Sequence, residues 1–123
     1  IAVQNRDTLQ ELSQLGNSAE PMAGAALGVV ILTPNPAERF SIMFDAGQAA
    51  AFMQLAAWEL EVGSVPASIY EAEMARKILG FPSEWHLRIA LSFGYPLDEE
   101  KITAPPKQGG RKPLEEFVHW ERW

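Results

Sequence analysis

A chain of 123 residues, 47% of them hydrophobic, is long enough to bury one apolar core and too short for two. Its formal net charge of -6 argues against nucleic-acid binding, and the absence of Cys excludes disulfides, thiolate metal ligands and cysteine nucleophiles. Because no segment resembles a signal peptide or a membrane span, and a Cys-free chain fits a reducing compartment, we expect a cytoplasmic protein.

The first third of the chain predicts a strand, a helix and a second strand. Residues 1–3 form an apolar, β-prone run without a polar lead-in, which we interpret as the end of a strand. Asp7 opens a capping pattern, and three leucines follow at helical spacing, so a short helix should end near Leu15. The continuous apolar run 25–32 is typical of an interior strand that is covered on both faces.

The middle of the chain predicts two helices joined by an extended link. Residues 41–60 have a helical pattern that is apolar around the whole circumference, which requires burial on several sides, in a larger fold or against another subunit. Pro66 excludes a continued helix over 64–68. A second helix is expected over 71–79, with acidic residues in its first turn, basic residues near its end, and Gly80 as its stop.

The last third predicts one strand and a long tail. Residues 86–93 alternate with period two, which is the clearest strand signal in the sequence. Residues 97–110 form a loop without periodicity, and 113–123 form an arm with three large aromatic residues that should dock on its own body or on a partner chain. We therefore expect a layered α+β or α/β domain over 1–123, with a C-terminal loop and arm over 97–123.

Side-chain catalysis and metal binding have no candidate in the sequence. The glycines do not have the spacing of a phosphate-binding loop, and no Ser lies in a nucleophile-elbow sequence. His86 and His119 lie on different elements without nearby carboxylates at metal-binding spacing. We therefore predict no catalytic side chain and no metal site.

Two features suit an organic cofactor. The small-residue link 63–69 lets backbone approach a flat ligand and offer its N–H and C=O groups, although an ordinary connection is the simpler reading. Arg111 and Lys112 follow two glycines and can clamp a phosphate, although a solvated basic spot before a helix has the same pattern.

Four segments, in this order along the chain, resemble the nitroreductase family: 45–60 with the following Gly63-Ser64, 75–82, 90–96 and 111–120. Together they cover nearly the whole chain, and no one of them is decisive alone. The resemblance implies an α+β, three-layer nitroreductase-like fold, in which helices flank a small mixed sheet and two copies form an intertwined homodimer.

The resemblance also implies an FMN-dependent oxidoreductase. In such enzymes NAD(P)H delivers a hydride to the flavin, and a nitroaromatic or quinone-type acceptor then takes its place, in two sites at the subunit interface. The cofactor-binding residues carried over by match are Pro66, Ala67, Ser68 and Ile69 along the isoalloxazine ring, and Arg111 with Lys112 at the FMN phosphate.

The chain departs from the family pattern in two places. Glu61-Val62 stands where relatives usually have Leu-Gly, and the Arg-rich flavin-binding segment of the family is not present ahead of Ile1. We therefore expect the C-terminal portion of a nitroreductase that lacks this N-terminal segment. The alternative is a catalytically inactive, truncated nitroreductase-like protein with a binding or structural role.

Overall fold

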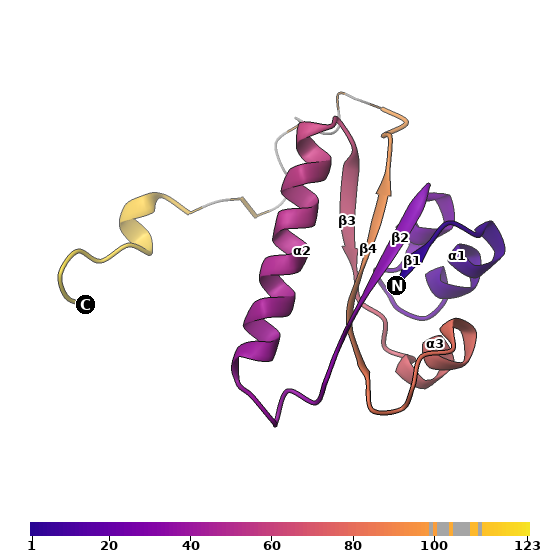
Figure 1. Cartoon of the computed structure of the whole chain (residues 1–123). Helices are drawn as coiled ribbons and strands as arrows, with labels where there is room; N and C mark the ends of the chain where they lie inside the picture. Colours follow the sequence, from indigo (N-terminus) through magenta and orange to yellow (C-terminus); the bar gives the residue numbers. More distant parts are fainter. Residues whose placement is uncertain (99, 101–103, 105–108, 111) are drawn as a thin grey trace.

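The computed structural model describes residues 1–98, 100, 104, 109–110 and 112–123. Their chain order is β1 (Ala2–Val3), α1 (Arg6–Ser13), η1 (Glu20–Gly24), β2 (Leu27–Thr33), α2 (Ser41–Glu59), β3 (Gly63–Ala67), α3 (Ala72–Leu79), β4 (His86–Gly94) and η2 (Leu114–Glu116). A four-stranded sheet lies between α2 on one face and α1 with α3 on the other (Figure 1). The α+β, three-layer prediction is confirmed.

The sheet has the order β1-β2-β4-β3, and each described pair of neighbouring strands is antiparallel. The expectation of a mixed sheet is therefore wrong for the described residues. β2 and β3 are joined through α2 and run in the same direction, but β4 lies between them and pairs with both, for example Val29 with Leu91 and Val65 with Ser92. The interior position predicted for β2 is confirmed, and β4 is the second interior strand.

Local sequence signals explain most of these elements. The Asn5 Oδ1 atom accepts a hydrogen bond of 3.0 Å from the Thr8 backbone N–H, so Asn5 is the N-cap of α1, and the prediction of Asp7 is corrected by two residues. Gly80 ends α3 with a φ of 70°, a left-handed conformation that glycine adopts at no steric cost. The predicted link at 64–68 is largely β3, an edge strand in which Pro66 is tolerated because an edge residue needs no second ladder partner.

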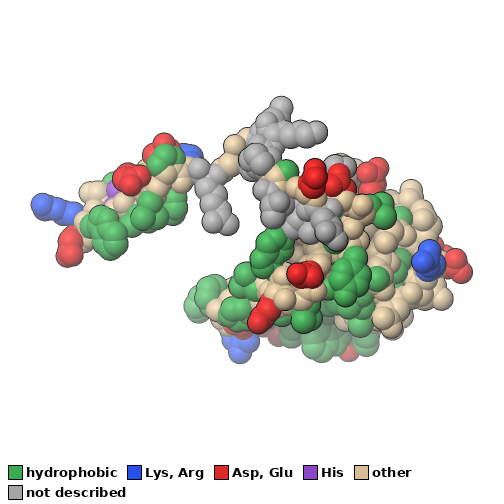
Figure 2. All heavy atoms as spheres, turned by 90° about the horizontal axis from the view of Figure 1, so that it is seen from above, with side chains coloured by type: hydrophobic (Ala, Val, Ile, Leu, Met, Phe, Trp, Pro, Cys, Tyr) green, Lys and Arg blue, Asp and Glu red, His purple; other side chains and the backbone are tan. Residues whose placement is uncertain are grey.

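The body and the C-terminal arm differ in packing. The arm, residues 113–123, projects away from the sheet on the α2 side, and hydrophobic side chains lie along it (Figures 1 and 2). Its large apolar residues are exposed: Leu114 (55%), Phe117 (58%), Trp120 (79%) and Trp123 (100%). The arm therefore does not dock on its own body in this structure, which was one of the two expected alternatives.

Candidate functional site

The segment predicted to line the flavin ring begins inside β3 and continues beyond it. The side chain of Ala67 is fully buried in the core, whereas Pro66 and Ser68 on either side of it are exposed. Ile69 is half-buried and packs against the same core. In the described part of the chain β3 pairs with β4 alone, so the other edge of this segment is open.

Two backbone donors on this open segment have no acceptor among the residues that the structure describes. Neither the Ser68 N–H nor the Ile69 N–H makes a hydrogen bond with any described residue, although the next two N–H groups do: Tyr70 donates to the Leu15 carbonyl at 2.8 Å and Glu71 donates to it at 3.3 Å. Backbone donors that lack a protein partner bind water or a ligand. Two consecutive free donors beside an exposed proline fit the edge of a flat, acceptor-rich ring such as a flavin.

A cavity of about 630 Å³ opens beside the first half of β3. Its walls come from η1, the C-terminal half of α2, the adjoining ends of β3 and β4, and residues 95–98, which follow β4. Gln54 donates to the Ser64 hydroxyl at 3.3 Å across this region, and the Ser92 hydroxyl donates to the Val65 carbonyl at 3.2 Å. Pro66 and the three residues after it do not line the cavity, so the predicted ring segment lies next to it rather than within it.

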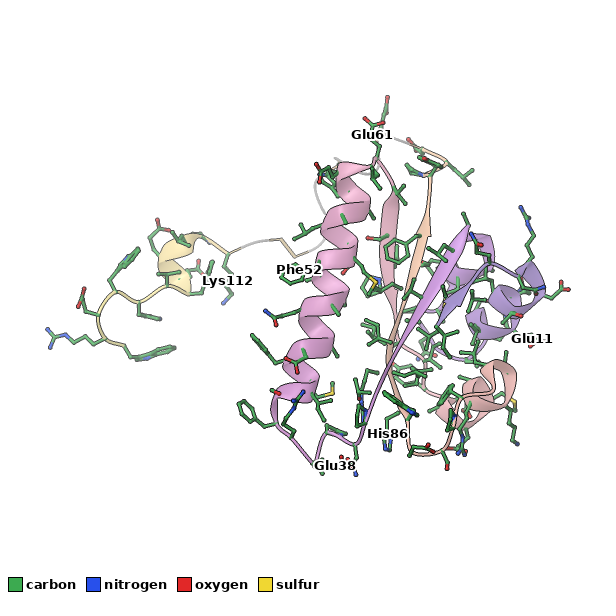
Figure 3. All side chains as sticks on the ribbon, in the orientation of Figure 1. Glu11, Glu38, Phe52, Glu61, His86 and Lys112 are labelled. Atoms are coloured by element: carbon green, nitrogen blue, oxygen red, sulfur yellow. The ribbon has the colours of Figure 1, made fainter. Side chains whose placement is uncertain are left out.

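Of the two residues predicted to hold the phosphate, the structure describes only Lys112. Arg111 falls outside the described residues. Lys112 lies at the start of the arm, on the far side of α2 from β3 (Figure 3), and its Nζ atom is 3.8 Å from Glu116 Oε2 with both side chains mostly exposed. Within one copy of the chain, Lys112 and the segment 66–69 are therefore not brought together.

The outer face of α2 is apolar and exposed. The helix buries only four residues, Ile42, Ala46, Ala50 and Ala57, three of them alanines. Phe52 points away from the sheet (Figure 3). We call the following set the α2 outer face: Met43 (47% exposed), Phe44 (66%), Phe52 (63%), Leu55 (63%) and Trp58 (56%). A monomeric protein seldom leaves so many large apolar side chains on one helix, so this face suits an interface.

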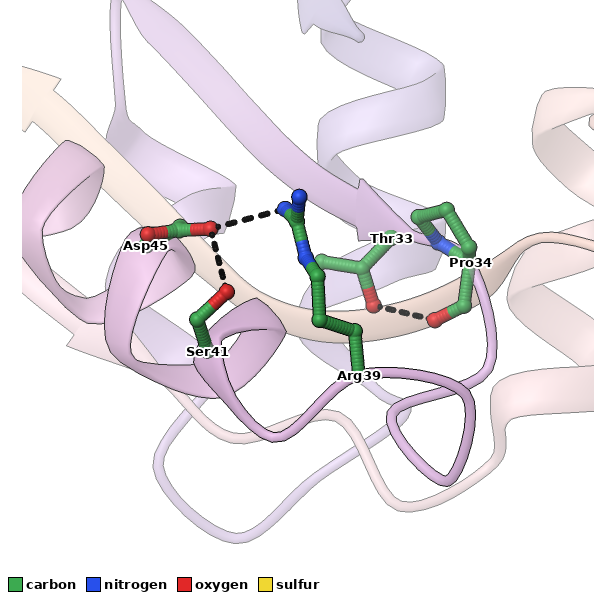
Figure 4. A network of polar contacts seen from close by, with 5 residues as sticks. All are labelled: Thr33, Pro34, Arg39, Ser41 and Asp45. Atoms are coloured by element: carbon green, nitrogen blue, oxygen red, sulfur yellow. Dashed lines mark hydrogen bonds and ion pairs between the residues drawn. The ribbon is translucent and has the colours of Figure 1, made fainter.

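A polar network fixes the chain where it enters α2 (Figure 4). The Asp45 carboxylate accepts from Arg39 at 3.1 Å and from the Ser41 hydroxyl at 3.3 Å, and Thr33 donates to the Pro34 carbonyl at 2.9 Å. The Arg39 and Asp45 side chains are more than half exposed and pair with each other. These contacts link the first turn of α2 to the chain that leads into it.

Two other possibilities find no support in the described ranges. Their His, Asp and Glu side chains form no group of three that could hold a metal ion. No helix within these ranges is both long and apolar enough to cross a membrane.

Comparison with family models identifies one family, whose model matches most of the chain. The model of the nitroreductase family matches residues 2–95. No curated protein matches the chain.

Solved structures extend this likeness over the whole chain. An FMN-dependent nitroreductase from Clostridium difficile is 22% identical, with a TM-score of 0.79, and the match covers 100% of this chain and 74% of that one. A protein of Bacteroides thetaiotaomicron named as an NADH dehydrogenase/NAD(P)H nitroreductase has the same identity and TM-score, with 100% and 71% covered. The NADPH:FMN oxidoreductase from Vibrio harveyi, solved with NAD+, is 19% identical, with a TM-score of 0.75 and 100% and 58% covered. These identities show a shared fold.

Proposed function

The chain belongs to the nitroreductase family. We therefore propose that it functions as an FMN-dependent oxidoreductase, which passes a hydride from NAD(P)H through flavin to nitroaromatic or quinone-type acceptors. The observation that carries this proposal is the pair of free backbone donors at Ser68 and Ile69, on the open edge of a segment whose fold is held by a buried alanine. Bound FMN supplies the hydride-accepting and electron-donating chemistry, and the protein supplies position and surroundings.

The chain's own residues have separate tasks in this proposal. Ala67 anchors the segment in the core, so that the Ser68 and Ile69 N–H groups meet the ring edge without first having to reorganise. Pro66 offers the ring an apolar surface and no competing donor. Arg111 and Lys112 hold the phosphate, where charge-assisted hydrogen bonds are about twice as strong as neutral ones.

The assembly that we propose is a homodimer with the flavin site at the subunit interface. Its support is the exposed α2 outer face together with the exposed aromatic arm. Stable obligate interfaces bury about 2,000 Å² or more and resemble a core cut in half, and these two surfaces have that character. A site formed between two copies also accommodates the separation of Lys112 from the segment 66–69 within one copy. A cytoplasmic location stays a prediction.

The test is a flavin titration on the purified protein in the length that its gene encodes, followed by NADH and NADPH oxidation assays with a nitroaromatic and a quinone. We expect one FMN per chain and acceptor-dependent oxidation of at least one nicotinamide. Flavin binding without turnover favours the alternative of a catalytically inactive binding protein. A protein that binds no flavin contradicts the proposal.

A further inference from the structure

Gly16 follows α1 and faces the backbone of the proposed ring segment. A Cβ atom built on Gly16 would lie 1.8 Å from the Ser68 carbonyl oxygen and 2.9 Å from its carbon. Cβ atoms do not approach other atoms so closely, and both neighbours are backbone, so a side chain at this position must displace the Ser68–Ile69 peptide. Only glycine permits the observed approach.

The same turn holds the residues that come next. The Leu15 carbonyl accepts from both the Tyr70 N–H and the Glu71 N–H, at 2.8 and 3.3 Å. Leu15 itself is 9% exposed and belongs to the core, as does the fully buried Leu12 one turn earlier. The turn after α1 is therefore a rigid support on which residues 68–71 rest.

The contact at Gly16 also determines where the Ile69 N–H points. No described peptide bond is cis, and in a trans peptide the carbonyl oxygen and the following N–H point in opposite directions. Since the Ser68 carbonyl faces Gly16, the Ile69 N–H faces away from α1, on the side where the described residues offer it no acceptor. A shift of this peptide would turn the donor away from its present direction.

We propose that Gly16 is a positioning residue for the cofactor: its bare Cα lets the Ser68 carbonyl dock against the turn after α1, and this docking aims the Ile69 N–H at the flavin ring. The proposal rests on the proposed function for its ligand. It assigns a role in cofactor binding to a residue that touches no cofactor and lies on the opposite side of the segment from it.

Two glycine variants separate positioning from general packing. Gly16→Ala changes the Ser68–Ile69 peptide. Gly28→Ala would instead press on the flexible side-chain ends of Leu9, at 2.7 Å, and Met22, at 2.9 Å, and make an ordinary contact with the Val3 Cβ atom at 3.8 Å. The second variant disturbs the packing of the same helix α1 and leaves the segment 66–69 untouched. It is therefore the matched control for a purely structural effect.

The experiment measures both variants in the protein as its gene encodes it. The first readout is the amide NMR signals of Ser68, Ile69 and Tyr70 without flavin, and the second is the FMN dissociation constant with the visible absorption band of the bound flavin. We expect Gly16→Ala to move these three signals, to weaken FMN binding by about tenfold to a hundredfold, as the loss of one or two directed hydrogen bonds would, and to shift the absorption band. Gly28→Ala should leave the NMR signals, the FMN affinity and the absorption band close to those of the parent.

A variant that fails to fold is replaced by the double variant Gly16→Ala with Ser68→Gly. Glycine at position 68 lets the displaced peptide move aside, so the protein folds but the donor stays misdirected, and FMN binding remains weak. Ser68→Gly alone is the reference for this double variant, because it keeps the contact at Gly16 and carries any effect that the change at position 68 has by itself. Weaker FMN binding in the double variant than in Ser68→Gly supports the proposal, and equal binding contradicts it.

Several outcomes overturn the proposal. The first is that the Ser68 to Tyr70 signals do not move in Gly16→Ala. The second is that these signals move but the FMN affinity and the flavin absorption band stay unchanged. The third is that Gly28→Ala loses as much FMN affinity as Gly16→Ala does. A parent protein that binds no FMN contradicts the proposed function and removes this proposal with it. That failure is distinguishable, because it is seen before any variant is compared.

Discussion

The two faces of the sheet are covered in opposite ways. On the α1 and α3 face, large side chains point inward, and Leu9, Leu12 and Met22 are at most 1% exposed. On the other face, α2 turns mainly alanines toward the sheet and its large aromatic residues outward. The core on the first face is buried by residues of this chain. On the second face α2 packs against the sheet, and the outer side of α2 stays exposed. A helix that is apolar on all sides therefore needs packing partners on two sides, and the described part of the chain supplies one, the sheet.

The largest effect is expected from the same substitution made on each face. Leu12→Ala removes a fully buried side chain and should lower the free energy of unfolding by about 2–5 kcal/mol. Leu55→Ala, on the α2 outer face, should lower stability only at concentrations at which the parent is a dimer. Urea unfolding at low and high protein concentration measures both. A loss for Leu55→Ala that is equally large in dilute and concentrated samples would show that this residue packs within one chain.

A charge on the α2 outer face should separate the subunits. Phe52→Glu places a carboxylate in the proposed interface, and loss of one central aromatic contact weakens association by roughly 2 kcal/mol or more, about thirtyfold. The control is Met74→Glu on α3, an exposed apolar residue (47%) on the other face of the molecule. Sedimentation velocity across a dilution series gives the molar mass. A parent that is a monomer throughout, or a Phe52→Glu variant as dimeric as the control, is incompatible with the assembly proposed above.

The cation pair Arg111 and Lys112, directly before the arm, sharpens the comparison, because it would give a role in cofactor binding to the part of the chain outside the packed core. Replacing Arg111 and Lys112 together with Ala should raise the FMN dissociation constant by roughly tenfold to a hundredfold or more, since a charge-assisted hydrogen bond contributes about 1.5–3 kcal/mol net of its competition with water. Arg122→Ala removes a cation from the same arm and is the control. Isothermal titration with FMN measures the change, and an unchanged affinity in the double variant would remove both residues from the phosphate site.

The smallest effect is expected on the α1 and α3 face, where it tests whether a local capping residue stabilises α1. Asn5→Ala removes the side-chain cap of α1 and should cost about 1 kcal/mol, because the Thr8 N–H loses its acceptor. Gln4→Ala is the neighbouring control. Thermal unfolding followed by circular dichroism resolves such a difference, and equal melting temperatures for the two variants would show that the cap contributes nothing to stability.

Sequence patterns predicted the elements whose signals are local. The alternation in β4, the continuous apolar run of β2 and the long apolar α2 are each visible within one segment, and the structure confirms them. The strand character of β3 was missed, since small residues and Pro66 conceal it and only its pairing with β4 defines it. The antiparallel sheet was missed for the same reason, because strand order depends on contacts between distant segments.

In the candidate site, too, sequence patterns predicted the local features and missed those that depend on contacts between distant segments. Small residues predicted an open backbone over the link 63–69, and the family resemblance implied the segment 66–69 within it. The ring-binding role stays a prediction, and the Ser68 and Ile69 N–H groups, which have no acceptor among the described residues, support it. The part played by Gly16 could not be predicted, because a glycine after a helix has an ordinary explanation as a helix end. Its contact with Ser68 appears only when the two segments are placed side by side.

The proposed function is tested most directly by adding NADH, and separately NADPH, without oxygen to the protein loaded with FMN, while its visible flavin absorption is recorded. We predict that one of the two nicotinamides abolishes this absorption and that a nitroaromatic or quinone restores it, with one nicotinamide oxidised per flavin. A flavin absorption that neither nicotinamide changes, in a protein with FMN bound at one per chain, would contradict the proposed reaction.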